Sequence, residues 1–310
     1  MKAIAIKKAA ATILAAALIL PFTAQTPADA AAKAPKLSSS KGTTYVGFLA
    51  KTKIKNIKKS NISKLTVKSS DSAVSVSKSG LTIKAKGVSK GSATITATLK
   101  LKKAVNKRKT FKLTYKVTVN EIDDLTSIFG DHTALGIDFT KEYVDYIKTL
   151  DPKDFSAGLA ASVVDIGIPT LLLSDGLFSD NTSSMSRAFI YNPLSKAVEF
   201  FYDCSSTSGA YPVLATGGYL LWGSHHYACR FTVNLTEKKG TVETITGLYL
   251  QDVKTLSYTK SSVNFDGSIG ESKEENIAID DPYEPGDYDF YSKAWEADND
   301  APVKFTKISD

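Results

Sequence analysis

The chain has 310 residues and a formal net charge of +7, and this modest total conceals two segments of opposite sign. Residues 31–120 carry 22 lysines and arginines against one acidic side chain, Asp71, whereas residues 121–310 carry 14 basic and 30 acidic side chains. Such asymmetry informs on partners and solubility rather than on fold, so we expect the first segment to attract polyanions and exclude the second from that role.

Residues 1–30 have the three parts of a secretory signal peptide. Lysines at positions 2, 7 and 8 precede an apolar stretch, Ala9 to Leu20, and Ala28-Asp29-Ala30 is a small-x-small cleavage site. About a dozen apolar residues are too few to span a bilayer comfortably; the alternatives are an uncleaved anchor or a buried helix. We expect a secreted or cell-surface protein without a transmembrane segment after signal removal. With no cysteine after the apolar run, we expect no lipid anchor.

The remaining ~280 residues suit two domains of ordinary size. Residues 31–42 are polar and are predicted to form a linker. Residues 43–120 are predicted to form a small all-β domain, and residues 121–310 a second β-rich domain. The predicted fold class is therefore mainly β.

Apolar residues alternate with lysine, serine and threonine throughout the first domain, which is typical of half-buried antiparallel strands. Turn signals at Ser79-Gly80 and Lys90-Gly91 separate the runs. Several short strands in about 80 residues favour a β-sandwich. The positions predicted to face its core are Leu65, Val67, Val74, Val76, Leu81, Ile83, Ala85, Ala93, Ile95, Ala97, Leu99, Leu101, Phe111, Leu113, Tyr115, Val117 and Val119.

The segment LTVKSSDSAVSVSKSGLTIKAKG (65–87), followed by GSATITAT (91–98), resembles the bacterial immunoglobulin-like domain of group 2. It departs from that pattern at Val67, where the family often has an aromatic residue. The resemblance implies an immunoglobulin-like β-sandwich that serves as a spacer or adhesion module on an exported bacterial protein.

The basic side chains of this domain are its candidate binding residues, with an anionic cell-wall polymer, a surface glycan, phospholipid headgroups or another surface protein as partner. Two alternatives are a solvated face that keeps edge strands apart, and docking onto the acidic second domain. Nucleic acid is not expected, because export and the lack of aromatics among the lysines argue against it. The polyanion-binding candidates are Lys51, Lys53, Lys55, Lys58, Lys59, Lys102, Lys103, Lys107, Arg108 and Lys109.

Residues 121–155 are predicted to be helical, with an amphipathic helix at 139–150 that ends before Pro152. Short turns separate the predicted strands that follow, which favours a twisted antiparallel β-meander against which the helix packs. Residues 270–301 are predicted to form an acidic loop. The predicted strands are Ala160–Ile166, Thr170–Leu173, Arg187–Tyr191, Ala197–Tyr202, Tyr211–Ala215, Tyr219–Trp222, Ala228–Leu235 and Val242–Gln251.

The segment ASVVDIGIPTLLLSD (161–175), with the later Gly-Gly-Tyr219 and Ser-His-His-Tyr227, is similar to a segment of exported clostridial proteins related to FG-GAP or integrin-type repeats. That resemblance implies a calcium loop. Here Asp165 persists but the other acidic positions are missing, and calcium needs six to eight oxygen ligands. We therefore expect a scaffold without its ion, and no metal or cofactor.

No nucleophile or metal signature is present, so we expect no catalytic residues and no enzyme activity. His225 and His226 are adjacent on a predicted hairpin and would point to opposite faces of a strand, which disfavours one shared metal. A hydrolase that uses Asp165 and Asp175 is a minor alternative.

Cys204 and Cys229 are a disulfide candidate that would stabilise the fold by about 3 kcal/mol, the alternative being two buried thiols. Tyr219, Trp222 and Tyr227 are glycan-stacking candidates, the alternative being ordinary sheet core.

These observations predict an exported, non-enzymatic protein whose basic immunoglobulin-like module binds a wall polymer or acts as a spacer. Its β-rich second domain would bind a partner. A carbohydrate-binding accessory protein that acts through the aromatics of the second domain is the alternative.

Overall fold

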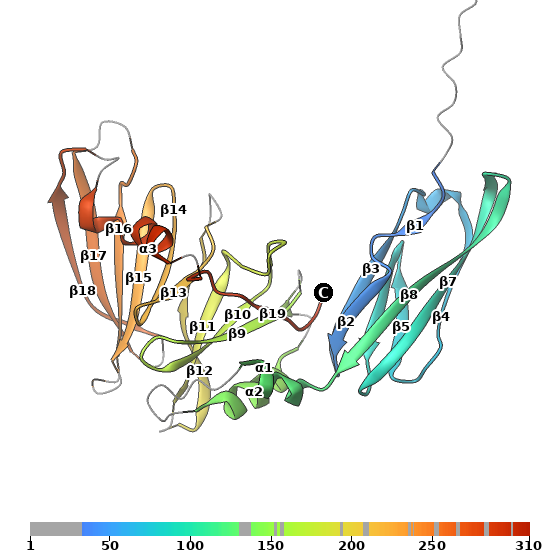
Figure 1. Ribbon diagram of the computed structural model, residues 1–310, viewed down its shortest axis with the longest axis horizontal. Helices are drawn as coiled ribbons and strands as arrows, with labels where there is room; N and C mark the ends of the chain where they lie inside the picture. Colours follow the sequence, from blue (N-terminus) through green and yellow to red (C-terminus); the bar gives the residue numbers. More distant parts are fainter. Residues whose placement is uncertain are drawn as a thin grey trace, which may run out of the picture.

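The chain folds into two β-rich units joined by short helices (Figure 1). The computed structural model describes residues 33–129, 138–151, 154–155, 158–192, 195–206, 211–234, 237, 239–250, 254–264, 267–281, 285–298 and 300–310. Strands make up 55% of the structure and helices 13%, which confirms the prediction of a mainly β protein with antiparallel sheets. The expected signal peptide lies outside the described residues.

The first unit is a sandwich of two four-stranded sheets. The β3 sheet has the order β1-β3-β6-β5, and the β7 sheet has the order β2-β8-β7-β4, with β2 parallel to β8. The strands are β1 Lys36–Leu37, β2 Lys41–Tyr45, β3 Leu49–Lys55, β4 Ile62–Ser69, β5 Val74–Ser79, β6 Thr82–Gly87, β7 Gly91–Val105 and β8 Arg108–Asn120. A 3-10 turn, η1 Lys59–Asn61, precedes β4.

The core of the sandwich follows the predicted period of two. Along β7, Ala93, Ile95, Ala97, Leu99 and Leu101 are all buried while the residues between them are not. The predicted linker at 31–42 is wrong, because β1 and the start of β2 lie within it. Its polar side chains gave no alternation, yet an edge strand pairs through its backbone and needs few apolar side chains.

The second unit contains two further sheets. The β10 sheet has the order β12-β11-β10-β9-β19, and the β15 sheet has the order β13-β14-β15-β16-β17-β18. Their strands are β9 Ala160–Asp165, β10 Pro169–Ser174, β11 Ser186–Asn192, β12 Ala197–Asp203, β13 Leu214–Thr216, β14 Tyr219–Ser224, β15 Tyr227–Asn234, β16 Lys239–Thr246, β17 Thr255–Asn264, β18 Ile269–Ala278 and β19 Thr306–Lys307. The predicted meander is therefore present, but it is divided between two sheets.

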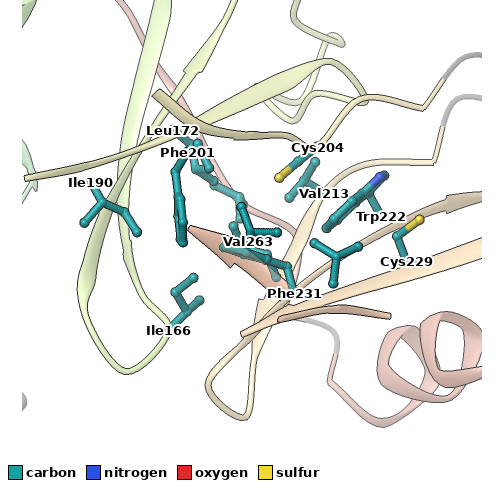
Figure 2. Packing of buried hydrophobic residues seen from close by; sticks show 14 of the residues in the cluster. Ile166, Leu172, Ile190, Phe201, Cys204, Val213, Trp222, Cys229, Phe231 and Val263 are labelled. Carbon is teal, nitrogen blue, oxygen red and sulfur yellow. The ribbon is translucent and has the colours of Figure 1, made fainter. Parts of the chain in front are cut away.

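The two sheets of this unit enclose one apolar core, which includes Leu172, Phe201, Trp222 and Phe231 (Figure 2). Helices cover their outer faces. The helix α2, Thr140–Thr149, packs with α1, Leu125–Phe129, and the 3-10 turn η2, Ile122–Asp124, against the β10 sheet. The helix α3, Phe290–Ala297, packs on the β15 sheet after the 3-10 turn η4, Gly286–Tyr288. Among the described residues, no helix has both the length and the apolar character needed to cross a membrane.

Three of the structural elements predicted for this unit differ from those observed. The predicted acidic loop at 270–301 contains most of β18 and all of α3. The strand predicted at Tyr211–Ala215 overlaps β13 only at residues 214 and 215, and β16 ends five residues before Gln251. Both faces of β18 are exposed along nearly its whole length. The strand therefore has no alternation of apolar and polar residues by which its sequence could be recognised.

The two units share a continuous apolar cluster at their junction. Tyr45 and Phe48 of the sandwich, each 2% exposed, pack in one cluster with Ile122, Leu125 and Ile308 of the second unit. The last residue, Asp310, donates its backbone N–H to the carbonyl of Leu49 at 2.7 Å. The units therefore dock mainly through apolar side chains and backbone, and not through the contact between basic and acidic faces that was one alternative from the sequence. Among the described residues, Lys90–Asp124 is the one ion pair between the units.

Candidate polyanion-binding surface

The outer face of the β3 sheet gathers six lysines. On β3, Ala50, Thr52 and Ile54 are buried, so the alternate residues face away from the core. Strand pairing then places Lys51 opposite Lys84, and Lys55 opposite Lys36. We call this set the lysine face: Lys36, Lys51, Lys53, Lys55, Lys84 and Lys86.

The spacing of the lysine face follows from sheet geometry. Residues opposite each other on paired strands lie about 5 Å apart, and alternate residues along a strand lie about 7 Å apart. On β5, Ser75 and Ser77 pair with Lys86 and Lys84 and add hydroxyl groups to the same face. Like charges directly opposite one another destabilise a sheet by up to about 1 kcal/mol per pair. The face thus keeps a repulsion that an anionic ligand would relieve.

The second group of predicted residues lies at the end of the sandwich farthest from the second unit (Figure 1). The β7–β8 hairpin turns there through Asn106 and Lys107, both with positive φ, which is typical of a two-residue type I′ turn. Pairing of Ile62 with Leu101 brings η1 beside the end of β7. We call this group the distal tip; its residues, all exposed, are Lys58, Lys59, Lys102, Lys103, Lys107, Arg108 and Lys109.

All ten predicted residues therefore belong to one sandwich, in two groups that meet where β3 ends. Sequence reasoning missed Lys36, Lys84 and Lys86. The run Lys84-Ala85-Lys86 already alternates around a buried alanine, so the signal for the last two was present. Lys36 could not be found in this way, because β1 is only two residues long.

Few carboxylates neutralise these lysines. Asp71, the sole acidic residue of the sandwich, accepts a hydrogen bond from the N–H of Ala73 at 2.7 Å and so serves a turn. Among the ion pairs recorded between described residues, the sandwich contributes only Lys90. The lysine face and the distal tip therefore remain available to an external anion.

The glycan-stacking prediction is wrong for the second unit, because its three aromatics do not share a surface. Trp222 is 3% exposed and lies between the sheets, while Tyr219 lies on the opposite face of β14 with the Arg230 guanidinium 5.1 Å from its ring centre. Positions separated by three point to opposite sides of a strand, which the sequence alone already required. Tyr227 packs at the margin of the inter-sheet core.

The disulfide prediction is also wrong in this structure. Cys204 and Cys229 are both buried free thiols, and both belong to the inter-sheet core that contains Trp222 (Figure 2). Burial raises the pKa of Cys229 to about 11 and raises that of Cys204 above its ordinary value. Both thiols therefore stay protonated and act as small apolar side chains.

The remaining polar candidates lie in turns or at strand ends. Asp165 accepts a hydrogen bond from the N–H of Gly167 at 2.9 Å and closes the β9–β10 turn, while Asp175 follows the opposite end of β10. The two carboxylates are thus roughly a full strand, or about 17–20 Å, apart, too far for a hydrolytic pair. His225 and His226 lie in the β14–β15 turn. Across the described residues, no cluster of three or more His, Cys, Asp or Glu side chains is placed to hold a metal.

Comparisons with known proteins give no family assignment. No protein family profile matches the chain, and no curated protein matches it. Neither the immunoglobulin-like nor the FG-GAP resemblance therefore gains support at the level of a family.

Among solved structures, domains 4 and 5 of the S-layer protein SbsC share 24% identity over 28% of this chain and 44% of theirs, with a TM-score of 0.21. The match thus spans less than half of that protein fragment. Fibronectin(III)-like modules of CbhA from Clostridium thermocellum share 10% identity over 79% of this chain and 94% of theirs, with a TM-score of 0.22. A DUF4784 family protein from Bacteroides caccae shares 9% identity over 83% and 79%, with a TM-score of 0.18. Similarity this low carries no functional argument.

Proposed function

We propose that this protein is an exported, non-catalytic binding protein whose basic sandwich attaches it to an anionic polymer of the cell surface. The observation that supports the proposal most directly is the lysine face, where six lysines share one surface of a sheet whose own strands contain no acidic residue. The distal tip extends the same charge to the end of the sandwich. The second unit lies at the end of the sandwich opposite the distal tip, where the apolar junction holds it.

A polymer is a better match than a small ligand because the charges form a lattice rather than a pocket. An extended polyanion with negative groups every ~7 Å would meet successive lysines along β3. Binding of this kind releases counterions, so affinity falls steeply as salt rises. The exposed lysines keep their hydration until the polymer displaces it, which favours reversible attachment.

The test is retention of the full chain, without residues 1–30, on purified cell walls that contain or lack their anionic polymers. We expect retention on the first wall preparation, loss on the second, and release as NaCl rises from 50 to 500 mM. The variant Lys53→Gln/Lys55→Gln/Lys84→Gln/Lys86→Gln is expected to weaken retention at least tenfold at 150 mM NaCl.

A matched control removes four lysines from the β7 sheet of the same sandwich, as Lys64→Gln/Lys68→Gln/Lys112→Gln/Lys116→Gln. It lowers the net charge equally and is expected to weaken retention by less than threefold, since only long-range attraction is reduced. Equal losses in both variants would show that net charge alone acts, and salt-insensitive retention would reject the proposal.

A further inference from the structure

A cavity of about 330 Å³ lies at the junction of the two units. The sandwich contributes residues from β2, β3 and β8, and the second unit contributes Lys307 and Asp310. All lining residues are polar apart from one glycine: Ser39, Lys41, Gly42, Thr43, Lys51, Tyr115, Lys307 and Asp310.

The charges around this cavity do not cancel. Among the lining side chains, three lysines, Lys41, Lys51 and Lys307, stand against the single carboxylate of the Asp310 side chain, so the side chains carry a formal charge of +2. The Asp310 carboxylate is held there by the backbone N–H of Lys51, which donates to Oδ2 at 2.7 Å, and by the ammonium of Lys307. The cavity thus already binds one anionic group, the carboxylate of Asp310 itself.

A buried hydroxyl completes the polar lining. Tyr115 is 1% exposed, and its Oη reaches only a long hydrogen bond of 3.4 Å to the carbonyl of Lys51. Gly42 allows this hydroxyl to reach the cavity, because a Cβ at that position would collide with it. Burial, and secondarily the Asp310 carboxylate, raises the pKa of Tyr115, so the hydroxyl remains a neutral donor.

We infer that the junction cavity binds the phosphate-bearing sugar or polyol unit of an anionic ligand, with both units of the protein contributing to the site. A terminal phosphate monoester, which is a dianion at neutral pH, matches the formal charge of +2 on the lining side chains, whereas a phosphodiester within a polymer carries one negative charge. The volume equals that of about eleven water molecules, which suits one sugar-sized unit and lies at the small end of ligand sites. This inference rests on the proposed function. The lysine face would bind the polymer through many similar charges, and the junction cavity would add a specific binding site for one of its units.

The probe is glucose 1-phosphate, titrated into the full chain by isothermal calorimetry, with glucose and glucuronate as comparisons. We expect glucose 1-phosphate to bind, glucuronate to bind more weakly because it carries one negative charge, and glucose not to bind. Lys41→Gln and Lys307→Gln are each expected to weaken binding about tenfold, the effect of removing one close charge. Asp310→Asn is expected to strengthen it about tenfold by removing the competing carboxylate.

The matched control is Lys53→Gln, which removes a lysine from the lysine face without touching the cavity and is expected to change binding less than twofold. Melting temperatures of all variants establish that each is folded; if Asp310→Asn fails to fold, the two lysine variants decide. Glucose 1-phosphate that does not bind, or that binds all variants equally, overturns the inference.

Wall retention separates this inference from the proposed function. If glucose 1-phosphate fails to bind while retention still depends on the lysine face, the junction site is rejected and the proposed function stands. If glucose 1-phosphate binds as expected but retention ignores the lysine face, the proposed function is rejected and the cavity is a site for a free phosphorylated compound.

Discussion

At the residue scale, the two tryptophans of this chain have different roles. Trp222 is 3% exposed, and its ring lies 5.7 Å from that of Tyr202, which in turn stacks on Phe231. Trp295 lies on α3, is 42% exposed, and stacks on Tyr291 with ring centres 6.4 Å apart. Only the first is part of the inter-sheet core.

Trp222→Ala is therefore expected to lower the free energy of unfolding by about 3–5 kcal/mol, the cost of a large buried cavity. The measurement is urea unfolding followed by far-ultraviolet circular dichroism. Trp295→Ala serves as the matched control and is expected to cost at most about 1 kcal/mol, because its ring is 42% exposed and lies outside the inter-sheet core. Similar small losses in both variants would show that Trp222 does not support the core.

At the element scale, one carboxylate ties three strands of the β15 sheet together. Glu243 of β16 accepts hydrogen bonds from Arg230 of β15 at 2.8 Å and from Tyr258 of β17 at 2.6 Å. Phe290 of α3 also lies against Arg230, with the guanidinium 5.0 Å from its ring centre. Burial alone would raise the pKa of Glu243, but the two hydrogen bonds and the nearby cations together lower it below its ordinary value of 4.5.

A depressed carboxyl pKa stabilises the folded state above the unfolded pKa, and this contribution is lost as pH falls through the folded pKa. At pH 7 we expect Glu243→Gln to be less stable than the wild type by roughly 1.5–3 kcal/mol, the value of hydrogen bonds to a charged group. The difference should stay constant down to about pH 5 and shrink below about pH 4.5. Chemical unfolding at pH 3, 4, 5 and 7 measures it.

The exposed Glu271→Gln on β18 provides the comparison, with an expected change within about 0.5 kcal/mol at each pH. A gap between wild type and Glu243→Gln that is the same at pH 3 and pH 7 would contradict the assignment of a depressed pKa to this carboxyl.

Individual strands also show which parts of the fold and of the candidate site could be predicted from the sequence. Where one face of a strand is buried, as in β7, alternation predicted both the strand and its inward residues. Where a strand is buried on neither face, as in β18, the sequence carried no pattern. The lysine face was partly predictable, since Lys51, Lys53 and Lys55 alternate along one strand. The junction cavity was not, because it joins positions as far apart as Lys41 and Asp310.

At the scale of the whole molecule, the junction decides whether the two units behave as one body. Phe48 is 2% exposed, and it belongs to the same apolar cluster as Leu125 and Tyr143 of the helices and Ile308 near the last residue. Backbone bonds reinforce this contact, including that from Asp310 to Leu49. A cluster of this kind holds the lysine face in a fixed orientation relative to the second unit, which an exposed polar linker would not.

Phe48→Ala is therefore expected to uncouple the units. Removing a buried phenylalanine costs about 3–5 kcal/mol, and here the loss falls on the contact between units rather than on either sheet core. In scanning calorimetry, the wild type should unfold in one transition and the variant in two, while wall retention by the lysine face persists. Ile128→Ala is the control, because Ile128 is 49% exposed on the neighbouring helix α1 and its loss should leave a single transition. A single, unshifted transition for Phe48→Ala would mean that the sandwich and the second unit are not coupled through this cluster.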